Sequence, residues 1–295
     1  SINVNGNGNL NFNGGTLGEN TQVTVDNGSS FTNSGNVVLN NNDTLNGSFK
    51  QSTGNLSLAG VTTNGSLSLD GGDVNITGDQ TLTSGDTIGS GANLTVDATL
   101  TNNGGTINLN NGDKIESTGS ISQTSGTINA DNFATTADGG SLKVNGGSLN
   151  ISSGGLTLNN TGDTISAAVD AEINGKLTIN NGSITLNTGD KLNNSAITQN
   201  GGSLTISDIS TGSATLNSTS GNLTLDGATI EGNDTIAGAV NTTIGANGVT
   251  ISNTSADGIT LNNGDKINGT VNQQGGNLSL AGVTTNGSLS LDGGD

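Results

Sequence analysis

"GNLSLAGVTTNGSLSLDGGD" occupies residues 54–73, and the same twenty letters occupy residues 276–295. Within this stretch apolar residues alternate with small polar ones, as in Leu56-Ser57-Leu58 and Leu67-Ser68-Leu69. A period of two is the pattern of a β-strand with one buried face. Glycine and asparagine, which accept the positive φ of tight turns, separate the two runs. The stretch therefore predicts two short strands joined by a sharp turn.

The same pattern recurs along the whole chain at intervals near twenty residues, for example from Leu56 to Val74 to Leu94. No segment repeats with the helical period of 3.6 for more than a turn. A β-sandwich would carry similar turn signals, but it has no reason to repeat every twenty residues. Short cycles of this kind predict stacked coils, each burying its apolar face on the next. We therefore expect an all-β fold, a parallel β-helix or β-solenoid, with about fifteen rungs of near-twenty residues and strands ~4.8 Å apart.

A longer repeat contains the short one. Residues 39–73 match residues 261–295 at an offset of 222 residues. We expect residues 1–295 to form a single continuous β-solenoid segment of a longer protein built from such modules. Near-identical copies suit a stack in which each unit contacts only its neighbours.

The composition raises the alternative of disorder, because only 28% of the residues are hydrophobic and the net charge is −18. Two observations oppose it. Only 10% of the residues are charged, and Leu, Ile and Val stand in alternating runs rather than scattered. Disordered chains are also rich in Pro, which is absent here. A coil only two or three side chains wide needs few apolar residues to fill it.

Several functions are disfavoured by the residue types. The chain has no His, Cys, Tyr or Trp, and its six basic residues are all lysines, so a polysaccharide-degrading β-helix enzyme would lack its usual acid–base and sugar-binding groups. We expect no enzyme activity and no cofactor. The lysines are scattered without aromatic neighbours, which disfavours nucleic acid. No apolar run approaches the ~20 residues that span a bilayer.

Calcium is the one metal that the sequence leaves open. A turn of the form L-x-x-G-D-[TK]-[IL] recurs with variations, and its acids could offer hard oxygen ligands. The nonapeptide of calcium-binding β-rolls is absent. The other interpretation is that these acids cap turns and keep neighbouring solenoids apart by like charge. The candidate residues are Asp43, Asp86, Asp113, Asp163, Asp190, Asp234 and Asp265.

A carbohydrate- or ice-binding module is the main alternative function. It would need a flat face that carries one residue type in register. Only Thr81-Leu82-Thr83 and Thr99-Leu100-Thr101 show the Thr-x-Thr spacing of an ice-binding ladder. Mapping the outward residues rung by rung would test this alternative.

The cadence "GNLSLAGVTTNGSLSLDGG" and the cycles of G-x-L-T-I or G-x-I-T-L resemble the repetitive passenger regions of large bacterial surface adhesins of the filamentous-haemagglutinin and autotransporter type. The resemblance implies a right-handed β-helix, export to the cell surface, and a stalk or fibre that serves adhesion or a surface coat. The expected partners are neighbouring repeats of the same or like chains, end to end or laterally, and host or surface glycans. The expected location is extracellular or at the cell surface.

Overall fold

The computed structural model describes residues 1–254 and 258–294, and throughout these residues the chain is β-strand and turn without a helix. The strands stack in parallel in about 14 turns of about 20 residues, so the predicted β-solenoid is confirmed, with about one turn fewer than expected. None of the described residues forms a helix long and apolar enough to cross a bilayer. The chain forms two compact units, residues 1–148 and 149–295.

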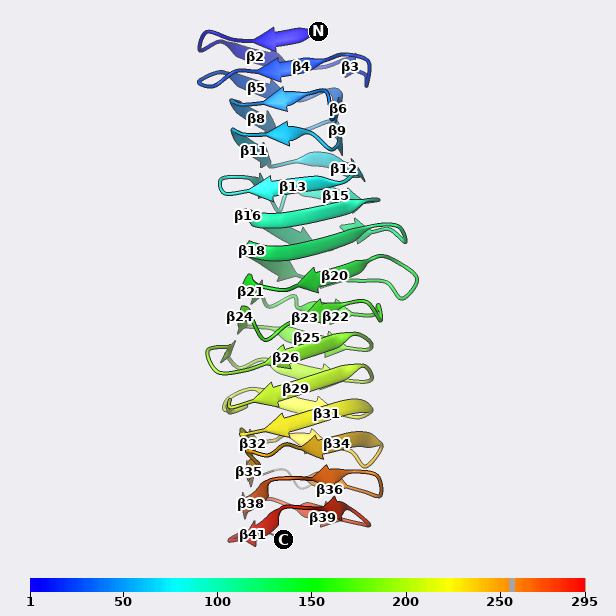
Figure 1. Cartoon of the computed structure of the whole chain (residues 1–295), viewed down its shortest axis with the longest axis vertical. Helices are drawn as coiled ribbons and strands as arrows, with labels where there is room; N and C mark the ends of the chain where they lie inside the picture. Colours follow the sequence, from blue (N-terminus) through cyan, green and yellow to red (C-terminus); the bar gives the residue numbers. More distant parts are fainter. Residues whose placement is uncertain (255–257, 295) are drawn as a thin grey trace. The chain divides into compact units, whose positions relative to one another are not determined.

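In the first unit the alternating runs form three short strands in most rungs, and each strand pairs with the equivalent strand of the next rung (Figure 1). One parallel sheet contains β1 (Ile2–Val4), β4 (Val23–Val25), β7 (Thr44–Leu45) and β10 (Thr62–Thr63). A second contains β3 (Thr16–Leu17), β6 (Asn36–Asn40), β9 (Asn55–Ala59), β12 (Gly72–Gly78), β15 (Ala92–Val96) and β17 (Lys114–Ile115).

The remaining strands of this unit include two long ones that bend across two faces, β16 (Thr99–Asn110) and β18 (Ser120–Asp131), whose mutual register shifts in the middle. The others are β2 (Asn9–Phe12), β5 (Ser30–Asn33), β8 (Ser48–Gln51), β11 (Ser66–Leu69), β13 (Gln80–Thr83), β14 (Thr87–Ile88), β19 (Phe133–Ala134) and β20 (Ser141–Val144). Strand β21 (Gly147–Ile151) lies at the unit boundary.

The second unit repeats the arrangement. One sheet contains β22 (Leu156–Leu158), β25 (Lys176–Ile179), β28 (Ala196–Gln199), β30 (Thr215–Ser218), β33 (Thr235–Ile236), β36 (Ile259–Leu261) and β39 (Leu278–Leu280). Another contains β23 (Thr164–Ile165), β26 (Ser183–Leu186), β29 (Ser203–Ser207), β31 (Gly221–Asp226), β34 (Val240–Ile244), β37 (Lys266–Ile267) and β40 (Thr284–Thr285), together with β24 (Val169–Ile173) and β27 (Lys191–Leu192). The third contains β32 (Ala228–Gly232), β35 (Val249–Asn253), β38 (Thr270–Gly275) and β41 (Ser288–Leu291).

The core of each unit is a narrow column of stacked apolar side chains. Leu58 and Leu177 are fully buried, while Ser57 between two inward leucines stays partly exposed. Many apolar residues stack on apolar residues of the next rung, and the rings of Phe31 and Phe49 lie 5.1 Å apart in register. The alternation therefore correctly predicts that Leu58 and Leu177 point inward.

The two copies of the duplicated sequence fold into the same series of strands. In the first unit the copy forms β7 to β11, and in the second unit it forms β37 to β41. Strands β7 and β37 begin 222 residues apart, as do β8 and β38, β10 and β40, and β11 and β41. Asp295, the last residue of the second copy, lies outside the described residues.

Candidate functional site

The seven recurring aspartates occupy one structural position, immediately before a two-residue strand. The strands that follow them are β7, β14, β17, β23, β27, β33 and β37. Six of the seven carboxylates are buried, and that of Asp190 is half-buried. The sequence predicted turn residues with surface charge. The turn is confirmed, but the carboxylates point inward, so they do not supply the expected outward charge.

One oxygen of each carboxylate accepts a hydrogen bond from a backbone N–H of the same turn. In the first unit, Asp43 Oδ2 accepts the N–H of Asn40 at 2.7 Å, and Asp113 Oδ2 accepts that of Asn110 at 2.7 Å. The donor always lies three residues before the acid. The other bonds of this kind are Thr83 to Asp86, Asn160 to Asp163, Asn187 to Asp190, Glu231 to Asp234 and Asn262 to Asp265, at 2.7 to 3.2 Å.

The other oxygen accepts a hydrogen bond from a backbone N–H of the preceding rung. Thr24 pairs with Thr44, so Val23 and Asp43 are in register, and the Val23 N–H donates to Asp43 Oδ1 at 2.6 Å. The carboxylate thus takes the place of a backbone carbonyl in the ladder. The equivalent bonds are Leu67 to Asp86, Leu94 to Asp113, Ala171 to Asp190, Leu216 to Asp234 and Thr242 to Asp265, at 2.6 to 2.8 Å. We call this two-oxygen arrangement the aspartate staple.

Burial and hydrogen bonding act in opposite directions on these carboxyls. Desolvation raises the pKa of Asp113, and the N–H groups of Leu94 and Asn110 lower it by a smaller amount. Burial also raises the pKa of Asp190 and of Asp234, against the N–H groups that each accepts. A charged acceptor makes a stronger hydrogen bond than a neutral one, about 1.5–3 kcal/mol net. The staples therefore strengthen the connection between successive rungs.

Sequence reasoning missed three further buried polar groups that also connect rungs. Gln80 takes the place of a stapling aspartate one rung after Val61. Its Oε1 accepts a hydrogen bond from the Val61 N–H at 3.0 Å, and its Nε2 donates one to the Val61 carbonyl at 3.2 Å. At another corner, Asn102 Nδ2 donates to Gln123 Oε1 at 2.9 Å, and Gln123 Nε2 donates to Gly146 O at 2.9 Å. Buried amides thus connect successive rungs.

The aspartates do not gather into a metal cluster. They belong to separate rungs, and across residues 1–254 and 258–294 no three acidic side chains lie close enough to hold one ion. At six of these aspartates both carboxylate oxygens accept backbone N–H groups, which a calcium ion would have to displace; the six are Asp43, Asp86, Asp113, Asp190, Asp234 and Asp265. The geometry supports a structural role for these oxygens.

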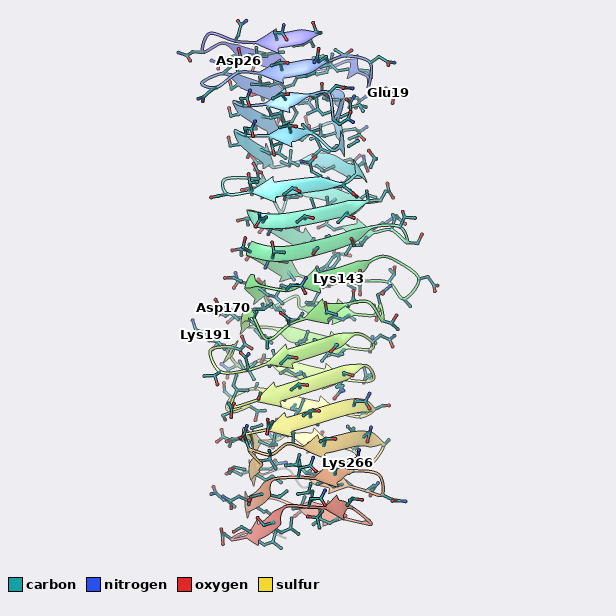
Figure 2. All side chains as sticks on the ribbon, viewed as in Figure 1. Glu19, Asp26, Lys143, Asp170, Lys191 and Lys266 are labelled. Carbon is teal, nitrogen blue, oxygen red and sulfur yellow. The ribbon has the colours of Figure 1, made fainter. Side chains whose placement is uncertain are left out.

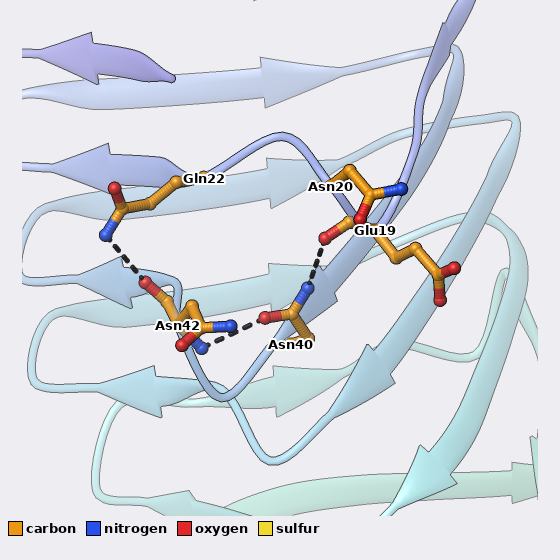
Figure 3. A pocket seen from close by; sticks show the side chains of 5 residues that line it. All are labelled: Glu19, Asn20, Gln22, Asn40 and Asn42. Carbon is orange, nitrogen blue, oxygen red and sulfur yellow. Dashed lines mark hydrogen bonds between the residues drawn. The ribbon is translucent and has the colours of Figure 1, made fainter.

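A pocket of about 340 Å³ lies beside the first staple and is lined by polar residues (Figure 3). Glu19, Asn20, Gln22, Asn40 and Asn42 line it. The amides of Asn40 and Gln22 already donate to backbone carbonyls, of Glu19 at 2.8 Å and of Asn42 at 3.2 Å. Its lining includes one carboxylate and no base or aromatic ring, so it offers no acid–base pair and no platform for a sugar ring.

The outward residues of the second unit form an ordered column. Thr185, Thr205, Thr224 and Thr243 are successive partners in the sheet. Lys266 ends the column. This is an in-register row of one residue type, which the sequence did not reveal because its threonines belong to different rungs. Thr81 and Thr101, from the two Thr-x-Thr runs predicted above, are also direct partners in the first unit.

Other charged side chains are exposed in both units, among them the labelled Glu19, Asp26, Lys143, Asp170, Lys191 and Lys266 (Figure 2). The ion pairs found among the described residues are exposed, with Lys50 Nζ 3.2 Å from Asp70 and Lys191 Nζ 3.8 Å from Glu172. Such pairs contribute little to stability.

No protein-family model, characterised protein or solved structure matches this chain.

Proposed function

We propose that the protein is a structural segment of an extracellular surface fibre or stalk, in which modules of 222 residues add length for adhesion or for a surface coat. The observation that carries the proposal is the folding of the duplicated sequence into equivalent strands, β7 to β11 and β37 to β41. A module that gives the same strands wherever it stands can be added without redesign.

The staples support the same role. Backbone pairing, buried leucines and a charged hydrogen bond all join one rung to the next within each unit. None of these contacts requires a ligand. Stability in such stacks is a sum over neighbouring rungs, so additional rungs extend the stack without weakening it.

The surface chemistry supports an exposed location. The net charge of −18 favours solubility and disfavours lateral clumping, and the chain carries no Cys or Met that an oxidising environment could alter. The resemblance to bacterial surface adhesins adds to this argument.

The experiment is to produce one, two and three tandem copies of residues 39–260 and to measure particle length by electron microscopy. We expect length to rise in equal steps while width stays constant. Compact particles whose width grows would contradict a fibre. Location is tested separately, by antibody labelling of intact source cells with and without protease treatment. Labelling only after lysis would contradict a surface role.

The second candidate is a carbohydrate- or ice-binding module, favoured by the column Thr185, Thr205, Thr224 and Thr243. Thermal hysteresis and co-sedimentation with insoluble polysaccharides test it directly. Replacing Thr205 and Thr224 by lysine should abolish either activity if the column binds. The same replacement of Thr32 and Thr95 in the first unit is the control, because their partners in the sheet are asparagine and lysine.

A further inference from the structure

The chain contains sixteen Asn-Gly steps. In such a step the glycine nitrogen can attack the side-chain amide carbon of the asparagine, because no glycine side chain hinders the approach. A ring N–C bond forms, the C–NH₂ bond breaks, and the glycine N–H proton leaves with the amide as ammonia. Water then opens the succinimide at either carbonyl and gives aspartate or isoaspartate. The reaction needs water and no oxidant.

At several of these steps the attacking glycine nitrogen is held in a backbone hydrogen bond. Gly47 N donates to Val25 O and Gly65 N to Leu45 O, each at 2.9 Å. Gly287 N makes the equivalent bond at 3.0 Å in the second unit. These bonds join neighbouring rungs, so attack requires local opening of the stack. Asn46, Asn64 and Asn286 are therefore protected in the folded protein.

Two other steps stand directly before a stapling aspartate. Asn111-Gly112 precedes Asp113, and Asn263-Gly264 precedes Asp265. All four residues of the two steps are exposed. Gly112 and Gly264 have φ of 110° and 106°, with no atom within 4 Å of the position of an added Cβ. In the described part of the chain their N–H groups donate no hydrogen bond.

We propose that Asn111 and Asn263 are sites of spontaneous deamidation in the folded protein, and that the modification loosens the adjacent aspartate staple. An aspartate product places a second carboxylate beside Asp113 or Asp265. An isoaspartate product adds one methylene to the backbone of the turn. Either change acts next to the carboxylates that accept the N–H of Leu94 and of Thr242.

The test follows the mass gain of about one dalton that deamidation causes, peptide by peptide, in a mildly alkaline buffer. We expect Asn111 and Asn263 to convert on the order of tenfold faster than Asn46, Asn64 and Asn286 in the folded protein, because only the latter group requires opening. In concentrated urea the difference should vanish. Equal rates at the two groups in the folded protein, or a difference that persists in urea, would overturn the assignment.

Two variants separate the site from its consequence. Asn111→Gln should suppress conversion at that peptide and leave Asn263 unchanged. Asn111→Asp imitates one product, and we expect faster hydrogen exchange at the Leu94 amide, with unchanged exchange at Thr242 as the internal control. Unchanged exchange at Leu94 in Asn111→Asp, and in isoaspartate-containing protein isolated after ageing, would refute the effect on the staple.

Discussion

Leu69 and Leu291 are the same residue of the duplicated sequence in opposite environments. Leu69 is 0% exposed and pairs with Ile88 of the next rung, whereas Leu291 is 62% exposed and lies in β41, which pairs with β38. The two leucines have the same flanking residues. Burial at this position is therefore supplied by the neighbouring rung, as expected for a stack in which no coil buries its own face.

The first prediction follows from this pair. Leu69→Ala should lower the free energy of unfolding by about 2–5 kcal/mol, because it removes buried methyl groups and leaves a cavity. Leu291→Ala should change it by less than about 0.5 kcal/mol, because the side chain is largely in water. Urea titrations followed by circular dichroism measure both. Similar losses in the two variants would contradict the assignment of burial to the adjacent rung.

The second prediction concerns the staple. Asp43→Asn keeps one acceptor oxygen but turns an NH₂ group toward Val23 or Asn40, leaving one buried N–H without an acceptor. We expect the free energy of unfolding to fall by about 1–3 kcal/mol. Hydrogen exchange at the Val23 amide should also accelerate.

Asp26→Asn is the matched control, since it removes the same charge from an exposed residue. We expect a change within about 0.5 kcal/mol. If both variants lost equal stability, net charge would explain the effect and the staple would not.

The sequence was sufficient to predict the strands and their inward faces, because alternation with a period of two is a local property of segments such as Leu56-Ser57-Leu58. It also located the turns that contain Asp43 and its equivalents. It could not show that Asp43 lies opposite Val23. That relation depends on the register between rungs, and rungs of unequal length obscure the register.

The buried amides were missed for a different reason. Gln123 stands two residues after inward-facing Ile121, so the alternation places it inside, and Gly126 follows three residues later. Asn33, Gln51 and Gln273 show the same spacing after an apolar residue. The signal was present, but polar residues were assumed to face water. A buried amide is tolerated here because the turn carbonyls accept its N–H groups.

A third prediction concerns close approach of the backbone at a corner. A Cβ on Gly65 would overlap the carbonyl oxygen of Gly47, so Gly65→Ala must push two rungs apart. We expect the free energy of unfolding to fall by about 1–3 kcal/mol. Gly18→Ala is the control, because no atom lies within 4 Å of its Cβ position. Thermal unfolding compares the two, and a tolerated Gly65→Ala would show that the stacking is looser than described.

The last prediction is a pH dependence. Burial raises the pKa of Asp113, Asp190 and Asp234 in the folded protein, so the folded state binds these protons more tightly than the unfolded chain. The free energy of unfolding should therefore rise as the pH falls through the folded pKa values toward the unfolded value of about 3.9. Relief of self-repulsion at net charge −18 acts in the same direction, so a control must separate the two effects. Replacing the three acids by asparagine should flatten the pH profile of stability more than replacing the exposed acids Asp26, Asp97 and Asp138. If the two triple variants flattened the profile equally, the pH dependence of stability would come from overall charge and not from the staples.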